Sequence, residues 1–188
     1  MILKRGFDLA LASILSLLFL LPMIMIAAWV RLSSKGPALY WSDRVGKNNR
    51  IFKMPKFRSM SIHTPVVATH LLTDSENHIT AVGKFLRKTS LDELPQLYSV
   101  LLGHMSFVGP RPALFNQYDL IELRTNYKIQ SLLPGITGWA QINGRDELDN
   151  EKKVKFDLDY KNRQSFFFDG YIIFKTITKV LCREGIDH

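Results

Sequence analysis

The sequence predicts a membrane-anchored protein in which helices outnumber strands and one compact domain follows the anchor. Three observations support this prediction. A run of 22 uncharged residues, 9–30, lies near the N-terminus. Strand-like patterns occur in a short stretch after it, whereas apolar residues at helical spacing recur through the rest of the chain. The length of 188 residues fits one ordinary domain beside a membrane segment.

The uncharged run is long enough for a bilayer, because a hydrocarbon core of about 30 Å needs roughly 20 apolar residues in a helix. Pro22 stands near the middle of the run and predicts a kink, since proline removes a helical hydrogen bond. Basic residues flank the run at both ends, so the positive-inside rule gives a spanning helix no clear orientation. A bent helix that enters and leaves by one face keeps both basic ends in the cytoplasm. We expect residues 1–35 to form this re-entrant anchor, with a plain transmembrane helix as the alternative.

The elements expected after the anchor begin with a hairpin. Its strands are predicted at Ala38–Trp41 and Arg50–Lys53, around the turn-rich residues 46–49. Residues 63–78 are polar and predict a loop. Helices are expected at 79–88, 94–102, 115–133, 154–163 and 171–183. The third and the last of these helices have basic residues beside their apolar positions, so each either covers the core or lies on the membrane surface.

The formal net charge of +8 implies an acidic partner, such as nucleic acid, anionic lipid or a phosphorylated substrate. Between residues 31 and 63, eight basic residues stand against one acid, Asp43. The single cysteine, Cys182, excludes an intramolecular disulfide and a cysteine-based zinc site. The eight basic residues are Arg31, Lys35, Arg44, Lys47, Arg50, Lys53, Lys56 and Arg58.

Asp92 and Glu93 are the candidate catalytic residues. They adjoin the start of the helix expected at 94–102, and the pattern allows either Ser90 or Asp92 as its N-cap. Pro95 favours Asp92, because it then falls in the first turn, where its missing N–H costs little. The partial positive charge of a helix N-terminus favours an ionised Asp92 and nearby phosphate oxygens. Such a carboxylate can attack phosphorus, bind Mg²⁺ or take a proton, although an acidic pair is more often a simple helix cap.

Arginines near this pair suggest phosphate binding. Arg87 precedes Asp92 by five residues. Arg111 stands between Pro110 and Pro112, and proline restricts both its own φ and the residue before it. A guanidinium on so stiff a turn suits bidentate phosphate binding.

Lys56 and Arg58 add two more cations. They are two residues apart on a possible strand and would therefore share one face. Each cation alone is as well explained by a solvated surface charge. Together, the four basic groups and two carboxylates predict a site for a polyanion held by metal and arginine.

Five sequence strings resemble the bacterial sugar transferases, which are the monotopic phosphoglycosyl transferases, and in particular their small single-domain members. In chain order they are Lys4-Arg5-Gly6-Phe7-Asp8, Lys56-Phe57-Arg58-Ser59-Met60, Thr89–Leu97, Met105–Pro112 and Pro134–Arg145. The resemblance extends from residue 4 to about 180. Each string is weak alone, but the set is specific. These enzymes transfer a sugar 1-phosphate from a UDP-sugar to undecaprenyl phosphate and release UMP, at the cytoplasmic face of the bacterial inner membrane.

The resemblance implies an α/β, mostly helical fold with a re-entrant membrane helix, interfacial amphipathic helices and a cytoplasmic catalytic domain at 36–188. It implies that Asp92 is the nucleophile, forms a phosphosugar–aspartyl intermediate and binds Mg²⁺. Glu93 would assist the attack or activate the lipid phosphate. Arg87 would lie near the nucleotide, and Arg111 would bind phosphate. Further substrate-binding candidates are Lys56, Arg58, Pro110, Pro112, Gln141 and Arg145.

Two positions depart from the family pattern. Leu21-Pro22 stands where the family often has Ser-Pro, so a side-chain hydrogen bond that helps the bend is missing and re-entry or spanning stays open. His104 stands where the family often has Asp, and we expect it at the surface or behind the site. The residues do not distinguish the sugar, although small members often take modified N-acetylated aminosugars. The glycan pathway and the oligomeric state also stay open.

Two other functions fit parts of the sequence. A membrane-tethered protein that binds nucleic acid or anionic lipid would use the basic run at 31–63. That function gives the acidic pair and the Pro-Arg-Pro turn no role, and we expect no nucleic-acid partner. A membrane phosphatase acting on lipid diphosphates would release inorganic phosphate, and its usual histidine nucleophile motif is not evident.

Overall fold

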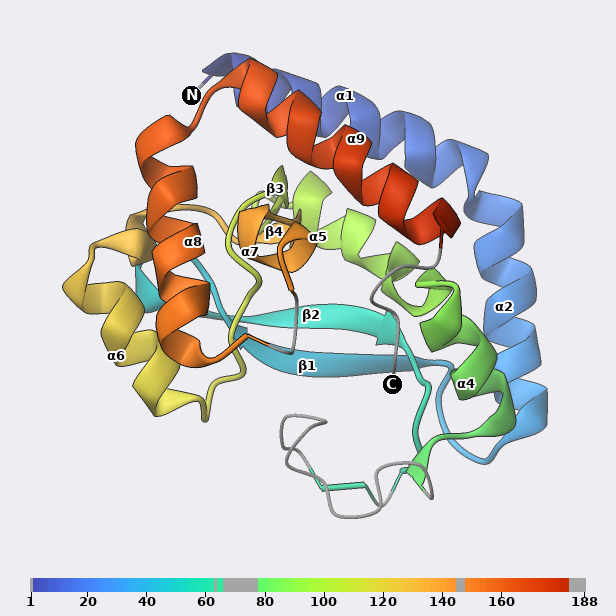
Figure 1. The fold of residues 1–188 in the computed structure, drawn as a ribbon. Helices are drawn as coiled ribbons and strands as arrows, with labels where there is room; N and C mark the ends of the chain where they lie inside the picture. The colour runs from blue at the N-terminus through green and yellow to red at the C-terminus, as the bar shows by residue number, and fades with distance from the viewer. Residues whose placement is uncertain (1, 63, 66–77, 145–147, 183–188) are drawn as a thin grey trace.

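The computed structural model describes residues 2–62, 64–65, 78–144 and 148–182. Within these ranges helices predominate over two small sheets, as the sequence predicts. In Figure 1, the helices labelled α1 and α9 both run along the top, and the β1–β2 hairpin lies on the opposite side of the short central elements. The structure is therefore layered between two long helices and a hairpin.

The predicted membrane segment forms two helices, α1 (Ile2–Leu18) and α2 (Leu20–Ser33). Among the described helices, none alone has the length and hydropathy to cross a membrane, but α1 and α2 meet that test as a pair bent by 61°. The predicted bend is therefore present, with its break at Phe19. Pro22 explains this position, since it has no N–H for the Leu18 carbonyl and its ring would clash with that group.

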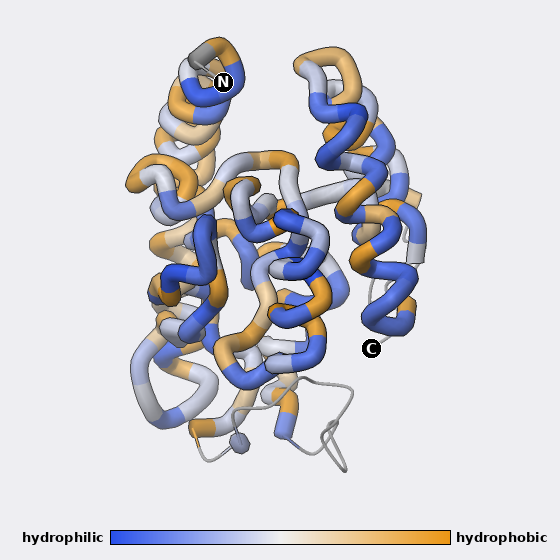
Figure 2. Tube along the Cα trace, turned by 90° about the vertical axis from the view of Figure 1, so that its left-hand side faces the viewer, coloured by the Kyte–Doolittle hydropathy of each residue, from blue (hydrophilic) through white to orange (hydrophobic). Residues whose placement is uncertain are grey.

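Large apolar side chains are exposed along α1, α2 and α9 (Phe166–Cys182). Leu17, Leu32 and Phe167 are 77%, 86% and 89% exposed. Figure 2 shows hydrophobic residues recurring along the helix that starts at the N-terminus. The opposite face of α9 contributes Phe168 and Ile172 to the core. Such an exposed apolar surface is typical of a protein that meets a membrane or another protein.

The predicted hairpin consists of β1 (Leu39–Val45) and β2 (Ile51–Phe57), which pair antiparallel and are longer than expected. Between them lies a 3₁₀ turn, η1 (Lys47–Asn49). Asn48 and Asn49 have φ of 55° and 58°, a left-handed conformation that asparagine tolerates. The predicted 63–78 loop lies mostly outside the described residues.

The helix α4 (Ala81–Lys88) begins at Thr80, whose hydroxyl accepts a hydrogen bond from the Gly83 N–H at 2.9 Å. Gly83 is needed there, because a Cβ would lie 1.9 Å from the Ser59 carbonyl oxygen. The chain beyond β2 and α4 therefore touch backbone to backbone.

A 3₁₀ turn, η3 (Leu91–Gln96), and the short helix α5 (Leu97–Leu101) replace the single helix predicted at 94–102. The prediction that Asp92 is an N-cap is wrong, since Asp92 lies inside η3. The N-cap position is Ser90, whose left-handed backbone (φ 56°) starts the turn early, and its side chain makes no capping bond. Ser90 N–H instead donates to the Arg87 carbonyl.

The strands β3 (Ser106–Val108) and β4 (Gly135–Thr137) form a parallel pair. The contact continues past β3, where Gly109 N–H donates to Thr137 O and Gly135 N–H to Pro110 O, both at 2.9 Å. A Cβ on Gly135 would lie 2.1 Å from Gly109 N, so glycine is required for this approach.

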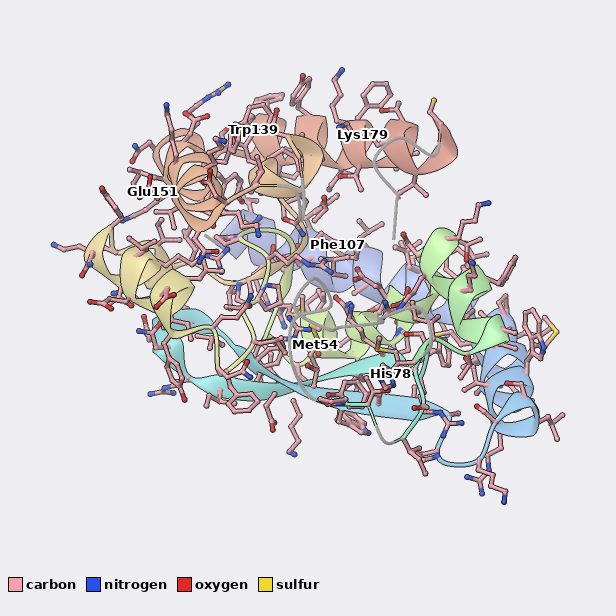
Figure 3. All side chains as sticks on the ribbon, turned by 60° about the horizontal axis from the view of Figure 1, so that its bottom comes forward. Met54, His78, Phe107, Trp139, Glu151 and Lys179 are labelled. Atoms are coloured by element: carbon pink, nitrogen blue, oxygen red, sulfur yellow. The ribbon has the colours of Figure 1, made fainter. Side chains whose placement is uncertain are left out.

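The remaining elements are α6 (Tyr118–Asn126), η4 (Ile129–Ser131), α7 (Trp139–Ile142) and α8 (Asn150–Arg163). The helix predicted at 115–133 is shorter than expected, because Lys128 has a left-handed φ of 55° after α6. Trp139 lies beside aromatic rings of α8 and α9 (Figure 3).

Substitution of Gly83 tests the close packing of α4. Alanine is intrinsically favoured over glycine within helices by about 0.8–1.0 kcal/mol. We nevertheless expect Gly83→Ala to lower the free energy of unfolding by about 1–3 kcal/mol, because the new methyl group would overlap the Ser59 backbone. Gly170→Ala in α9 is the matched control, since nothing lies within 4 Å of its Cβ position. Denaturant unfolding measures both, and equal stabilities would contradict the packing.

Candidate active site

Asp92 is 8% exposed in η3. Burial is the main cause that raises the pKa of its carboxyl, and Glu93 adds to the rise. Lys56, foremost among three nearby cations, partly offsets it by favouring the charged form. Within the described ranges, no group donates a hydrogen bond to this carboxylate. A buried carboxylate without such a donor is suited to contact a substrate or a metal ion.

Glu93 holds two cations from different parts of the chain. Its Oε1 accepts from Lys56 Nζ at 2.7 Å and from Arg111 Nη2 at 3.2 Å. The side chains of Glu93 and Lys56 are only 14% and 16% exposed. Burial lowers the pKa of Lys56, and Glu93 is the largest influence opposing that shift. Glu93 therefore keeps two positive groups beside Asp92.

The Pro-Arg-Pro segment is fixed through three successive carbonyl groups. The donors are Gly135 N to Pro110 O (2.9 Å), Arg124 Nη1 to Arg111 O (2.8 Å) and Arg44 Nη1 to Pro112 O (3.0 Å). Arg111 thus has its backbone held while its guanidinium reaches Glu93. The predicted stiff turn is present, and tertiary contacts add to the stiffness that proline provides.

Arg124 and Arg44 are residues that sequence reasoning did not select for the site. Arg124 also donates to Asp157 Oδ2 from two nitrogens, at 2.9 and 2.7 Å, which joins the segment to α8. Burial raises the pKa of Asp157, and Arg124 opposes the rise. No local pattern in the sequence marks these arginines, because their partners are distant along the chain.

Arg87 lies in the last turn of α4, where its Nε donates to Ser59 Oγ at 3.0 Å. Burial lowers the pKa of its guanidinium, and attraction to Asp92 opposes this shift. The close contact of Gly83 with Ser59 fixes the helix from which Arg87 extends. The structure therefore places Arg87, Lys56 and Arg111 all within electrostatic reach of Asp92.

The other candidates are placed differently. Arg58 donates to the Ser34 and Lys35 carbonyls and to Ser34 Oγ, at the end of α2. Lys56 and Arg58, predicted to share a face, thus make separate contacts. Gln141 lies in α7 and donates to Ile136 O at 3.0 Å, while its Oε1 is buried without a partner among described residues. Arg145 lies outside the described residues.

His104 is exposed, and its ring packs against Phe52 with centroids 5.6 Å apart. The basic run at 31–63 does not form one exposed surface, because Arg58 is buried and Lys56 is ion-paired to Glu93. A polyanion that bound along this run would therefore lack two of the eight cations that suggested such binding.

The described residues contain no group of three or more His, Cys, Asp or Glu that could hold a metal ion. Mg²⁺ is commonly bound by only one or two carboxylates, together with substrate phosphates and waters. Asp92, to which no described group donates a hydrogen bond, has carboxylate oxygens suited to this kind of coordination. The donor set therefore fits Mg²⁺ in company with a phosphate-bearing substrate.

Residues 1–183 match the family model described as bacterial sugar transferase. A UDP-glucose:undecaprenyl-phosphate glucose-1-phosphate transferase of Escherichia coli is 43% identical over 95% of this chain and 40% of its own length. The uncharacterized sugar transferase EpsL of Bacillus subtilis is 42% identical over 99% of this chain and 91% of its own length. A UDP-N-acetylgalactosamine-undecaprenyl-phosphate N-acetylgalactosaminephosphotransferase of Aeromonas hydrophila is 38% identical over 97% of this chain and 44% of its own length. The chain therefore spans less than half the length of the relatives from Escherichia coli and Aeromonas hydrophila.

The raised pKa of Asp92 predicts that Asp92→Asn stabilises the fold at neutral pH. Burial disfavours the ionised carboxylate, so the folded protein binds this proton more tightly than the unfolded chain does. The resulting stabilisation of the fold is complete below the unfolded pKa of about 3.9. It is lost as the pH rises through the higher pKa of the folded state. We expect a higher unfolding midpoint than wild type at pH 7, with the difference vanishing in acid. Asp119→Asn, at an exposed residue of α6, is the control. A lower unfolding midpoint for Asp92→Asn than for wild type at pH 7 would contradict the raised pKa of Asp92.

Proposed function

The chain belongs to the bacterial sugar transferase family, and from this premise we propose that it transfers a sugar 1-phosphate from a UDP-sugar to undecaprenyl phosphate. The products would be undecaprenyl-diphosphate-sugar and UMP. The observation that carries the proposal is the buried Asp92 carboxylate within electrostatic reach of Lys56, Arg87 and Arg111. A diphosphate substrate requires such cations, and a polyprenyl acceptor requires an apolar surface like that of α1, α2 and α9.

In the first step, an oxygen of Asp92 attacks the phosphorus that carries the sugar. The bond from this phosphorus to the bridging oxygen breaks, UMP leaves with that oxygen, and a phosphosugar–aspartyl intermediate remains. Asp92 must be ionised to attack. Lys56, Arg87 and Arg111 favour that form against the opposing effect of burial. The same cations offset the negative charge of the diphosphate.

In the second step, an oxygen of undecaprenyl phosphate attacks the phosphorus of the intermediate. The aspartyl oxygen–phosphorus bond breaks and the Asp92 carboxylate is restored. Glu93 assists one of the two attacks or accepts a proton from the lipid phosphate. Its ion pairs with Lys56 and Arg111 support a further task, which is to hold both cations at the reacting phosphates.

Mg²⁺ beside Asp92 would offset the charge that develops on the departing UMP. The phosphate-binding residues of this proposal are Arg87 and Arg111, with Lys56 beside them. We propose an N-acetylated aminosugar as the group transferred. The relatives named for glucose and for N-acetylgalactosamine make the sugar the part of the proposal that a substrate panel must decide.

We propose further that residues 1–35 form a re-entrant anchor and that residues 36–188 act at the cytoplasmic face of the bacterial inner membrane. Contacts at both ends of the helix pair support this arrangement. Lys4, near the start of α1, donates to Val108 O, and Arg58 binds the carbonyls that follow α2. A helix that spanned the bilayer would place its ends about 30 Å apart on opposite sides, where one domain could not contact both.

Release of UMP tests the reaction. Purified protein with undecaprenyl phosphate, Mg²⁺ and a panel of UDP-sugars should release UMP with at least one sugar, and chelation of the metal should stop it. Asp92→Asn should lower kcat by about a thousandfold or more, since it removes the nucleophile. Asp119→Asn, at an exposed residue on α6, should keep wild-type turnover. Undiminished turnover by Asp92→Asn would overturn the assignment of the nucleophile.

The pH dependence tests the electrostatic role of Lys56. Burial raises the pKa of Asp92 and Lys56 lowers it, so the acid limb of kcat/KM should lie above the ordinary aspartate value of about 3.9. Lys56→Met removes the charge that favours ionised Asp92, and the limb should move to higher pH. Lys53→Met, at an exposed lysine of the same strand, should leave it in place. A limb that moves to lower pH in Lys56→Met would contradict this role.

A further inference from the structure

We infer that Lys4, Arg5 and Asp8, in the first turns of α1, are positioning residues that fix both halves of the site relative to the helix that meets the membrane. The catalytic consequence rests on the proposed function, whereas the packing consequence does not. The string Lys4-Arg5-Gly6-Phe7-Asp8 is part of the family resemblance, and its charges otherwise serve only as flanks of the membrane segment.

Lys4 and Asp8 are one helical turn apart and together hold the backbone of β3. Lys4 Nζ donates to Val108 O at 3.0 Å, and Asp8 Oδ1 accepts from Phe107 N–H at 3.2 Å. Asp8 is 2% exposed. Val108 precedes Arg111 by three residues, so α1 fixes the strand that leads into the Pro-Arg-Pro segment.

Arg5 reaches the other half of the site. Its Nη1 donates to Val100 O at 2.7 Å, and its Nη2 donates to Leu101 O at 3.0 Å. These carbonyls end α5, where a cation is favourable. Since α5 directly follows the turn that carries Asp92 and Glu93, Arg5 holds the far end of the catalytic segment.

The same lysine joins α8 and α9 to this network. Lys4 Nζ pairs with Asp169 Oδ2 and donates to the Tyr160 hydroxyl at 3.3 Å. The Tyr160 hydroxyl lies 2.7 Å from Asp169 Oδ1 and 3.1 Å from Val108 O. Burial raises the pKa of Tyr160, so the hydroxyl remains a donor. Helix α9, with its exposed apolar face, is therefore fixed to the same strand as α1.

The contacts of Lys4 favour a positioning role over the binding of a lipid headgroup. An ammonium group has three donors, and Lys4 has three acceptors within the protein, on Val108, Tyr160 and Asp169. Its side chain is 21% exposed. The donors that a lipid phosphate would need are already used. The acidic Asp8, moreover, would repel an anionic headgroup.

The consequence for catalysis follows from geometry. In the proposed reaction the lipid reaches the site from the membrane, whereas Arg111 binds the UDP-sugar and Asp92 attacks it. These two residues lie on segments that adjoin β3 and α5, which α1 contacts. Loss of the hydrogen bonds from α1 to either segment would let β3 or α5 shift relative to α1 and α2. A displacement of about 1 Å at reacting groups can cost about a hundredfold in rate.

The test compares variants that remove or keep single hydrogen bonds. Asp8→Ala removes the acceptor for Phe107 N–H, whereas Asp8→Asn keeps an acceptor of the same shape. Arg5→Gln replaces the guanidinium that donates to the end of α5 by a shorter side chain. Lys35→Gln is the matched control, because it removes an exposed basic charge at the other flank of the membrane segment. The measurements are membrane recovery, unfolding midpoint, amide exchange at Phe107, and kcat and KM for UMP release.

We expect Asp8→Ala and Arg5→Gln to stay membrane-bound and to lower kcat by about tenfold or more, with KM for the UDP-sugar changed far less. Asp8→Asn should recover activity, and Lys35→Gln should match wild type. Wild-type kcat in both Asp8→Ala and Arg5→Gln would overturn the inference, as would a loss in Asp8→Asn equal to that in Asp8→Ala. If Asp8→Ala does not fold, Arg5→Gln decides the kinetic question.

Amide exchange separates this inference from the proposed reaction. Phe107 N–H should exchange faster in Asp8→Ala and stay protected in Asp8→Asn, whichever substrate the enzyme uses. Unchanged amide exchange at Phe107 in Asp8→Ala would contradict the inference that Asp8 holds β3. If the exchange changes as expected but no UDP-sugar yields UMP, the proposed reaction fails and the packing role stands.

Discussion

The pairing of Glu93 with Lys56 and Arg111 is the interaction on which the rest of the site depends. Buried charges are costly unless they are paired, and here cations from β2 and from the segment after β3 meet at a single carboxylate oxygen. Without Glu93, Lys56 and Arg111 would lose the carboxylate oxygen that both contact. Glu93 thereby joins two distant parts of the chain and leaves Asp92 free of any hydrogen-bond donor among the described residues.

The supporting structure extends this arrangement in two directions. Toward the interior, Arg124 and Arg44 hold the carbonyl groups around Arg111, and Asp157 in turn holds Arg124. Toward α1 and α2, both ends of the bent helix pair contact the segments that build the site, through Lys4, Arg5 and Asp8 at one end and Arg58 at the other. The site and this helix pair therefore form one packed unit. For a reaction between a soluble nucleotide sugar and a lipid, this unit would keep the depth of the nucleophile constant relative to the acceptor.

Local chemistry made much of this structure predictable. The uncharged run with Pro22 indicated a bent anchor, and a bend of 61° is present. Strand-forming residues around Gly46-Lys47-Asn48-Asn49 indicated the hairpin. Prolines beside Arg111 indicated a fixed guanidinium. In each case the cause lies within a few residues of the effect.

The features that were missed have distant causes. The turn η3 starts directly after Ser90, whose left-handed backbone no sequence rule required, and Asp92 therefore lies inside the turn and not at a cap. Arg58 was expected beside Lys56, but two nitrogens of its guanidinium donate instead to the carbonyls that follow α2. Arg124 and Arg44 act through partners far along the chain, where spacing rules carry no information.

Trapping of the covalent intermediate tests the central claim most directly. The protein is mixed with the UDP-sugar that it accepts and Mg²⁺, without undecaprenyl phosphate, then quenched in acid and digested for mass spectrometry. The account predicts a sugar-phosphate adduct on the peptide that contains Asp92, with UMP released in an amount no greater than the enzyme present. It predicts that adding the lipid removes the adduct. An unmodified peptide, together with UMP release that begins only when both substrates are present, would contradict a double displacement through Asp92.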